Sequence, residues 1–165
     1  ALVDQYEPGA RIERIEAPGR LDGGDVLAVG DRYFIGLTER TDAEGARQLI
    51  AILEAHAISG EAVPVEGMLH LKSGVAWLGG DLLLIQAALA DQPAFEGYRK
   101  LVVANDEAYA ANAIAVNGRV LMPAGHPKTR RAVEEAGLKV AEVATSEFQK
   151  LDGGPSCLSL RLARR

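Results

Sequence analysis

One pattern of secondary structure repeats three times along the 165-residue chain, and it constrains the fold more than any other feature. Each repeat has two short apolar strands that meet at a glycine-containing turn, then a helix-like stretch, then a third strand. The repeats cover about residues 22–66, 70–106 and 111–148. A period of about 45 residues is typical of propellers and similar repeat architectures, so we expect residues 1–165 to form one α/β domain.

Dipeptides that favour tight turns separate the first two strands of each repeat. They are Gly30-Asp31, Gly79-Gly80 and Asn117-Gly118. Asn-Gly is the strongest of the three signals, because both residues accept the positive φ angles of a type I′ turn. Each repeat is therefore expected to begin with a β-hairpin.

The helical stretches of the three repeats differ in quality. In the first, Thr41 and Glu44 match the Thr-x-x-Glu pattern of a capping box. In the second, Pro93 interrupts the helix, whereas in the third Pro127 suits the first turn and Gly137 the C-terminal end. The residues that would share the buried face of the first helix are Ala46, Leu49, Ile50, Leu53 and Ala57.

The two ends of the sequence have the character of strands that belong to neighbouring units. Residues 11–18 have the pattern of the last strand of a preceding unit, and residues 157–164 that of a closing strand. An open array would expose sheet edges that proteins normally protect. We therefore expect the ring to be completed by missing N-terminal units or by another copy of the chain in a homo-oligomer.

Composition argues against several classes of function. The net charge is −5 and the basic residues are scattered, so no nucleic-acid partner is expected. No apolar run approaches the roughly 18 residues that span a bilayer, so no membrane partner is expected. A single cysteine cannot form an internal disulfide, which favours a cytoplasmic location. No zinc-binding pattern and no phosphate or dinucleotide loop is present.

The single thiol, Cys157, follows a Gly-Gly-Pro-Ser loop and precedes an apolar run. Free cysteines are often small buried hydrophobes. However, Gly153 and Gly154 allow the backbone to approach a ligand closely. A nucleophilic cysteine needs such an accessible position, together with an acid–base partner. The residues alone leave both interpretations open.

Among the three histidines, His70 is the best candidate for that partner. His56 lies late in the first helix, and His126 lies where the third helix would begin. His70 lies on a short apolar segment, where it could also be a core residue with its hydrogen bonds satisfied. A single cysteine with a distant histidine is nevertheless a known arrangement of nucleophile and base.

An Asp-Gly-Gly sequence occurs both at the start of the first repeat and beside the cysteine. Asp22 and Asp25 flank the first pair of glycines, and Asp152 precedes the second pair. Asp and Gly dominate turns, so both stretches could be turns and nothing more. Alternatively, acidic side chains gather at the same mouth of the ring as the thiol. Carboxylates there would hold a cationic guanidinium group by paired charge-assisted hydrogen bonds.

Five stretches together resemble the dimethylarginine dimethylaminohydrolases, a family of the pentein superfamily. The stretches are RIEAPGRLDGGDVL, YFIGLTERT, GMLHLKSG, YAANAIAVNGRVLMPAGHP and TSEFQKLDGGPSCLSL. The resemblance implies an α/β propeller of five ββαβ units around a central channel. This chain would contain about three of the five units, from the C-terminal part of the family's usual length.

The resemblance also implies the catalytic residues. Cys157 would be the nucleophile, His70 the general acid and base, and Asp22 the carboxylate that binds the guanidinium group. The implied reaction converts a methylated arginine to citrulline and dimethylamine or methylamine through a covalent thiouronium intermediate. No cofactor and no metal are needed, although zinc could bind the Cys–His pair and inhibit.

Three further residues would bind the methylated arginine. Arg40 matches a position that contacts the substrate carboxylate, and the backbone near Leu151 matches one that receives the α-amino group. Asp25 is expected to bind substrate as the second carboxylate of the acidic motif. Two alternatives stay open: an arginine deiminase or amidinotransferase of the same superfamily, and a non-catalytic repeat module with Cys157 and His70 in its core.

Overall fold

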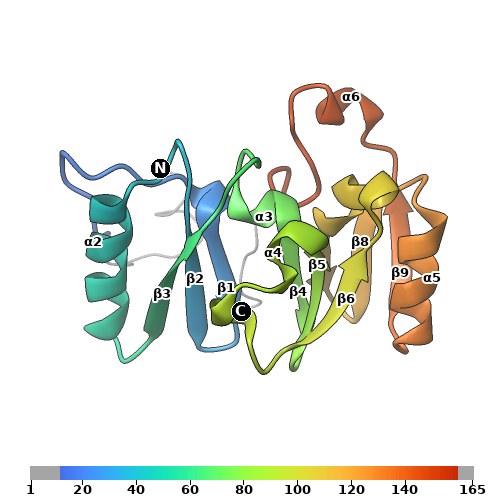
Figure 1. Ribbon diagram of the computed structural model, residues 1–165, viewed down its shortest axis with the longest axis horizontal. Helices are drawn as coiled ribbons and strands as arrows, with labels where there is room; N and C mark the ends of the chain where they lie inside the picture. The colour runs from blue at the N-terminus through green and yellow to red at the C-terminus, as the bar shows by residue number, and fades with distance from the viewer. Residues whose placement is uncertain (1–11, 160–165) are drawn as a thin grey trace.

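The computed structural model describes residues 12–159, which form three small sheets side by side (Figure 1). Each sheet has three strands in sequence order. The first two strands pair antiparallel as a hairpin, and the third pairs parallel with the second after a helical connection. This arrangement confirms the ββαβ unit and its threefold repetition.

The first unit follows the predicted order of elements. Val29 pairs with Arg32, which confirms Gly30-Asp31 as a two-residue hairpin loop. The parallel strand then pairs along the whole length of the second strand. The elements are η1 (Gly23–Asp25), β1 (Val26–Val29), β2 (Arg32–Leu37), α2 (Ala43–Glu54) and β3 (Ser59–Pro64).

Helix α2 differs from the prediction at both ends. Its N-cap is Asp42, whose side chain accepts a hydrogen bond from the Gly45 N–H, so the predicted Thr41–Glu44 capping box is wrong. The helix ends at Glu54, and Ala57 lies beyond it with a positive φ of 58°. The other predicted inward positions are buried or partly buried against β2, namely Ala46, Leu49, Ile50 and Leu53.

The second unit has two short helical pieces where one helix would normally cross the sheet, because Pro93 begins a separate turn. Gly79 pairs with Leu82 after a bulge, so the hairpin turn is Gly80-Asp81, one residue later than predicted. The elements are α3 (Leu71–Gly74), β4 (Val75–Gly79), β5 (Leu82–Gln86), α4 (Ala87–Ala90), η2 (Pro93–Phe95) and β6 (Arg99–Val103).

The third unit agrees with the prediction at its turns. Asn117 and Gly118 have φ angles of 50° and 72°, as a type I′ turn requires. His126 precedes the first helical residue, Pro127, and Gly137 follows the C-cap with φ of 85°. The elements are η3 (Asn105–Ala111), β7 (Ile114–Val116), β8 (Arg119–Pro123), α5 (Pro127–Glu135), β9 (Lys139–Val143) and α6 (Ser146–Gln149).

The strand predicted at 11–18 is wrong for residues 12–18, which form no strand. Their backbone is tied to α2 instead. The Gln48 side chain accepts a hydrogen bond from the Glu16 N–H and donates one to the Glu16 carbonyl. Of the predicted closing strand at 157–164, residues 160–164 lie outside the described residues, and 157–159 form no strand.

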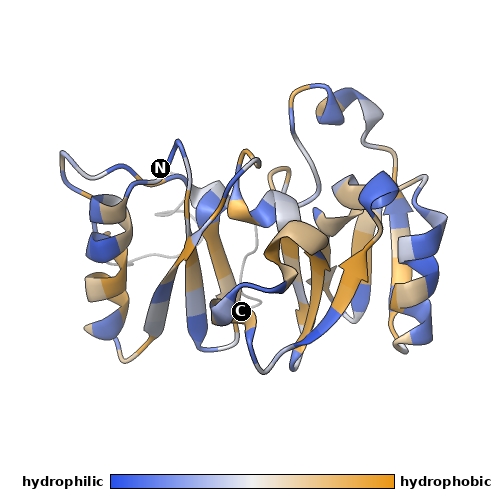
Figure 2. Cartoon of the chain, in the orientation of Figure 1, coloured by the Kyte–Doolittle hydropathy of each residue, from blue (hydrophilic) through white to orange (hydrophobic). Residues whose placement is uncertain are grey.

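The cores lie between units as well as within them. Phe34 of the first unit and Phe95 of the second pack with ring centroids 5.1 Å apart. A second cluster joins the second and third units. Strand β4 contacts both β1 and β7, so the first strands of the units lie next to one another. Figure 2 shows hydrophobic central strands and hydrophilic outer faces on the flanking helices. None of the helices in residues 12–159 is both long and apolar enough to cross a membrane.

Candidate active site

Three segments from different units meet at one end of the sheets (Figure 1). They are η1, which leads into β1, the short helix α3, which leads into β4, and the C-terminal loop of residues 150–159 that follows α6. Each segment contains one of the residues predicted to be catalytic. Asp22 is the N-cap of η1, His70 is the N-cap of α3, and Cys157 lies in the C-terminal loop.

Asp22 and His70 form the centre of the site. The Asp22 Oδ2 atom lies 3.3 Å from His70 Nε2. The other carboxylate oxygen, Oδ1, accepts a hydrogen bond of 2.8 Å from the Gly24 N–H. This backbone hydrogen bond is the main cause that holds the pKa of Asp22 below its ordinary value of 3.8; partial burial opposes it, and His70 and Arg40 add to the lowering. The carboxylate is therefore ionised at neutral pH and can bind a cation.

The imidazole of His70 is held by packing. Its side chain is only 12% exposed. Gly24 lies against the ring, since a Cβ on Gly24 would come 2.5 Å from His70 Cγ. Although Asp22 is close, neither ring nitrogen has an aligned hydrogen-bond partner in the described part of the chain. Buried polar atoms are nearly always paired, so these nitrogens are suited to a ligand or to proton transfer.

Asp25 does not face a ligand, and the prediction that it binds substrate is wrong. Its side chain is fully buried. One oxygen accepts hydrogen bonds from the hydroxyls of Thr38, at 2.8 Å, and Thr41, at 2.7 Å. The other accepts the Leu71 N–H at 2.9 Å. Internal donors thus use both oxygens, which leaves no accessible atom for a substrate.

Arg40 lies at the rim of the same site. Its Nη1 is 4.0 Å from Asp22 Oδ2, and about half of its side chain is exposed. The backbone N–H of Arg40 donates to the hydroxyl of Thr38, which fixes the loop after β2. The structure therefore brings Asp22, His70 and Arg40 together, as the sequence predicted.

The C-terminal loop is anchored on the third unit. The Asn112 side-chain oxygen accepts hydrogen bonds from the backbone N–H of Ser156, at 3.2 Å, and from its hydroxyl, at 2.7 Å. The Tyr109 hydroxyl donates to the Gly153 carbonyl at 2.6 Å. Cys157 itself is exposed, so it is not a buried core residue. Its exposure is compatible with the role of an accessible nucleophile.

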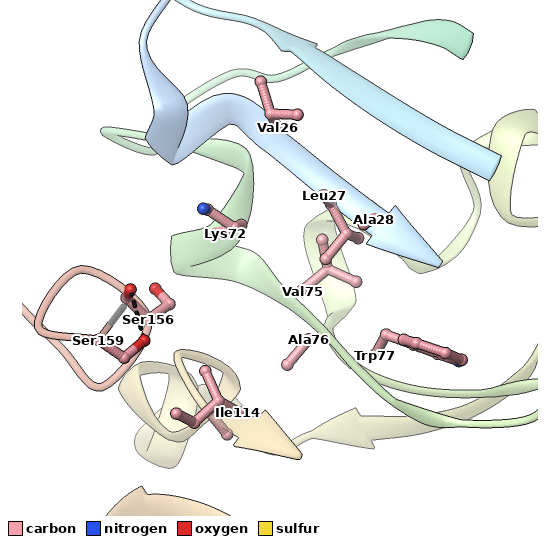
Figure 3. A pocket seen from close by; sticks show the side chains of 11 residues that line it. Val26, Leu27, Ala28, Lys72, Val75, Ala76, Trp77, Ile114, Ser156 and Ser159 are labelled. Atoms are coloured by element: carbon pink, nitrogen blue, oxygen red, sulfur yellow. Dashed lines mark hydrogen bonds between the residues drawn. The ribbon is translucent and has the colours of Figure 1, made fainter. Parts of the chain in front are cut away.

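Two cavities separate this loop from the segment that contains His70. One, of about 200 Å³, has Ser156 and Ser159 on one side and Lys72 on another (Figure 3). The other, of about 340 Å³, is lined by Asp152 from the loop and by residues 67–69 and 73 from the His70 segment. The residues that flank His70 and those that flank Cys157 therefore border the same spaces.

Leu151 belongs to the same loop and is 85% exposed. Its backbone N–H donates to the Phe148 carbonyl at 3.0 Å. None of the backbone hydrogen bonds described for residues 12–159 ends on the Leu151 carbonyl. A ligand amino group would therefore meet the carbonyl and not the N–H.

The residues that support the site from behind have no clear signature in the sequence. Thr38 gave no signal, and the pattern around Thr41 indicated a helix cap and not a contact with Asp25. Asn112 gave no signal because its partner Ser156 lies 44 positions away. Within residues 12–159 no group of three or more His, Cys, Asp and Glu residues is arranged to hold a metal ion.

No protein-family model matches the chain, but individual relatives do. It is 50% identical over 159 residues to the N(G),N(G)-dimethylarginine dimethylaminohydrolase of Pseudomonas aeruginosa, a match that covers 96% of this chain and 62% of that protein. The protein of the same name from Streptomyces coelicolor is 36% identical over 154 residues, or 93% of this chain and 59% of that protein.

A solved structure gives the same result. The Pseudomonas aeruginosa dimethylarginine dimethylaminohydrolase, as a cysteine-to-serine variant complexed with citrulline, superposes with a TM-score of 0.93 at 48% identity. The match covers 98% of this chain and 63% of that one, so the chain spans about three fifths of the length of these relatives. The three ββαβ units are thus part of a pentein-type α/β propeller, and the chain belongs to the dimethylarginine dimethylaminohydrolase family.

Proposed function

We propose that the complete protein hydrolyses Nω,Nω-dimethyl-L-arginine and the monomethylated form to L-citrulline and dimethylamine or methylamine. The observation that carries this proposal is the Asp22–His70 pair. An ionised carboxylate lies 3.3 Å from a buried imidazole whose nitrogens have no aligned partner. This pair can bind a guanidinium group and transfer protons to and from it. The relatives that bear the name of this activity support the choice of substrate.

The first half of the proposed reaction forms a covalent intermediate. Asp22 would orient the guanidinium group by charge-assisted hydrogen bonds. The Cys157 thiolate adds its electron pair to the guanidinium carbon and forms a C–S bond. Protonated His70 gives its proton to the methylated nitrogen, whose C–N bond to the central carbon then breaks. The amine leaves neutral, and a thiouronium remains on the cysteine.

The second half reverses these roles. Neutral His70 accepts a proton from a water molecule as the water oxygen attacks the same carbon. The C–S bond breaks and its electron pair returns to sulfur. The hydroxyl left on the carbon gives its remaining proton to solvent water, and neutral citrulline is released. The proton that His70 takes from the water replaces the one that it gave to the amine, so His70 is again protonated at the end of the cycle.

The remaining contacts of the substrate are also part of the proposal. Arg40 would bind the α-carboxylate, and the Leu151 carbonyl would accept a hydrogen bond from the α-amino group. Because this chain spans about three fifths of its relatives, we assign the rest of the pocket to N-terminal units of the protein or to a second copy in a homo-oligomer. The single cysteine cannot form an internal disulfide, which is typical of proteins in a reducing compartment, so we propose a cytoplasmic location.

Citrulline formation by the complete protein tests the proposal. Asymmetric dimethylarginine and arginine are compared as substrates, with Cys157→Ser as the inactive control. We expect release from dimethylarginine that the variant abolishes, and little release from arginine. Equal or faster release from arginine would instead identify an arginine deiminase. No citrulline from either substrate would refute hydrolysis, and the protein would then be an amidinotransferase or a non-catalytic module.

A further inference from the structure

A chain of buried hydrogen bonds runs behind the site and joins the two halves of the acid–base pair. The backbone N–H of Asp22 donates to the Thr41 hydroxyl at 2.9 Å. That hydroxyl donates to one oxygen of Asp25 at 2.7 Å, and the Leu71 N–H donates to the other at 2.9 Å. Leu71 directly follows His70. The backbone of Asp22 and that of His70 are therefore connected through two side chains that no solvent reaches.

The rigidity of this connection follows from the burial of Asp25. Its carboxylate is fully buried, and the described part of the chain places no cation among the donors that contact it. A buried carboxylate is tolerated only when hydrogen bonds satisfy its oxygens, so each of its donors is held in place. Gly36 lies so close that a Cβ there would be 3.2 Å from Asp25 Oδ1, which leaves the carboxylate little room to shift.

We infer that Asp25 and Thr41 are positioning residues that set the separation between Asp22 and His70, and through it the rate of the chemical step. Neither side chain reaches a ligand, so both act through the residues they hold. The expected change in kcat rests on the proposed function, whereas the expected change in the placement of Asp22 and His70 does not. The bonds within η1, from the Gly24 N–H to the Asp22 side chain and from the Asp25 N–H to the Asp22 carbonyl, are local, whereas the bond from the Asp22 N–H to the Thr41 hydroxyl ties the turn to the segment before α2.

The third unit contains a network of the same kind, between η3 and the start of α5. The Glu107 carboxylate is buried and accepts hydrogen bonds from the Thr129 hydroxyl at 2.8 Å and from two backbone N–H groups at the start of α5. Thr129 is 3% exposed, against 0% for Thr41, and has the same kind of partner. Its hydroxyl has no described contact with the Asp22–His70 pair. Thr129→Val therefore shows how far the loss of such a buried hydroxyl lowers the melting temperature when the hydrogen bonds behind Asp22 and His70 are kept.

The test compares Thr41→Val, Thr41→Ser and Thr129→Val in the complete protein, with dimethylarginine as substrate. In Thr41→Val we expect kcat to fall by about 10- to 100-fold, since a catalytic group misplaced by about 1 Å can cost about 100-fold. The KM should change less than kcat, because the proposed contact of the Leu151 carbonyl with the substrate does not depend on Thr41. Thr41→Ser keeps the hydroxyl and should restore kcat, and Thr129→Val should keep kcat with a melting temperature as low as that of Thr41→Val.

A second measurement does not depend on turnover. The rate at which diethyl pyrocarbonate modifies His70, read by peptide mass spectrometry, should rise in Thr41→Val and stay unchanged in Thr129→Val, because His70 is 12% exposed while its support is intact. If the unmodified protein makes no citrulline, the proposed function fails and this rate alone decides the inference.

The inference is overturned if Thr41→Val keeps its kcat, if Thr41→Ser is as slow as Thr41→Val, or if His70 is modified equally fast in all three variants. Should Thr41→Val not fold, Asp25→Asn serves instead. The amide keeps the shape of Asp25 and one acceptor oxygen, and the same loss of kcat and faster modification of His70 are expected.

Discussion

Gly24 is the residue against which the His70 ring packs, and Gly24→Ala tests whether the position of the ring limits catalysis. A Cβ at this position would lie 2.5 Å from His70 Cγ and 2.6 Å from Cδ2, whereas ordinary contacts begin at 3.4 Å. The ring or η1 must therefore move by about 0.9 Å, the difference between 3.4 and 2.5 Å. Gly24 is not among the glycines with positive φ, so alanine accepts its backbone and the clash alone causes the effect.

The displacement is close to the scale at which enzymes lose activity. A shift of about 1 Å at a catalytic group can cost about 100-fold in rate, so we expect kcat for dimethylarginine to fall by about 10- to 100-fold in Gly24→Ala. Inserting a methyl group into a packed region also destabilises by about 1–3 kcal/mol, which a thermal melt would detect as a modest loss. Citrulline release under saturating substrate, by protein confirmed to be folded, gives kcat directly.

The neighbouring glycine supplies the control. A Cβ on Gly23 would meet nothing within 4 Å, so Gly23→Ala introduces the same methyl group one residue away without a clash. We expect its kcat to match that of the unmodified protein. If the two alanine variants have the same kcat, the placement of the His70 ring by Gly24 has no bearing on the reaction, and the reasoning from the clash is refuted.

Three further predictions address the loop, helix α2 and the core. Asn112→Ala removes the acceptor that holds Ser156, and we expect steady-state kinetics to show kcat reduced by about tenfold or more as the C-terminal loop loosens; an unchanged kcat would contradict the anchor. Hydrogen bonds from Arg47, and then from Gln48, lower the pKa of Glu44 to about 2. A lowered pKa means that the ionised carboxylate stabilises the fold. In urea melts, the stability difference between the unmodified protein and Glu44→Gln should therefore be complete above pH 4.5 and vanish as the pH falls to about 2. A difference that does not change with pH would contradict this role of Glu44. Phe95→Ala should lower the free energy of unfolding by about 3–5 kcal/mol in chemical denaturation, because the ring packs between the first two units; a loss below about 1 kcal/mol would mean that the units do not share a core.

The repeated units were predictable because their signals are local. Asn117-Gly118 defines a type I′ turn by the backbone angles these two residues accept, whatever surrounds them. The turn after β4 was displaced by one residue because a bulge lies between Trp77 and Gly79. The Trp77 indole N–H donates to the Gly80 carbonyl at 3.0 Å, and a contact between an aromatic side chain and the turn does not show in a dipeptide pattern.

The capping box failed for a reason that involves tertiary structure. Thr41 has the right spacing from Glu44, but its hydroxyl serves the buried carboxylate of Asp25, 16 residues earlier. Leaving that carboxylate short of a donor would cost more than an N-cap contributes, which is about 1 kcal/mol. The next residue, Asp42, is an equally good N-cap, so the helix loses nothing when Thr41 is used elsewhere.

Asp22 and Asp25 show why a motif alone could not assign the ligand-binding carboxylate. The two residues flank the same glycines, yet Asp22 stays 37% exposed beside His70, whereas Asp25 is fully buried. What separates them is a set of donors that lie 13, 16 and 46 positions away along the chain. A buried carboxylate that accepts several internal hydrogen bonds has a structural role. A carboxylate with an accessible oxygen can bind a cation. The resemblance implied that Asp22 binds the guanidinium group, and the structure places it beside His70. Only the distant hydroxyl and N–H groups show that Asp25 instead supports the site from behind.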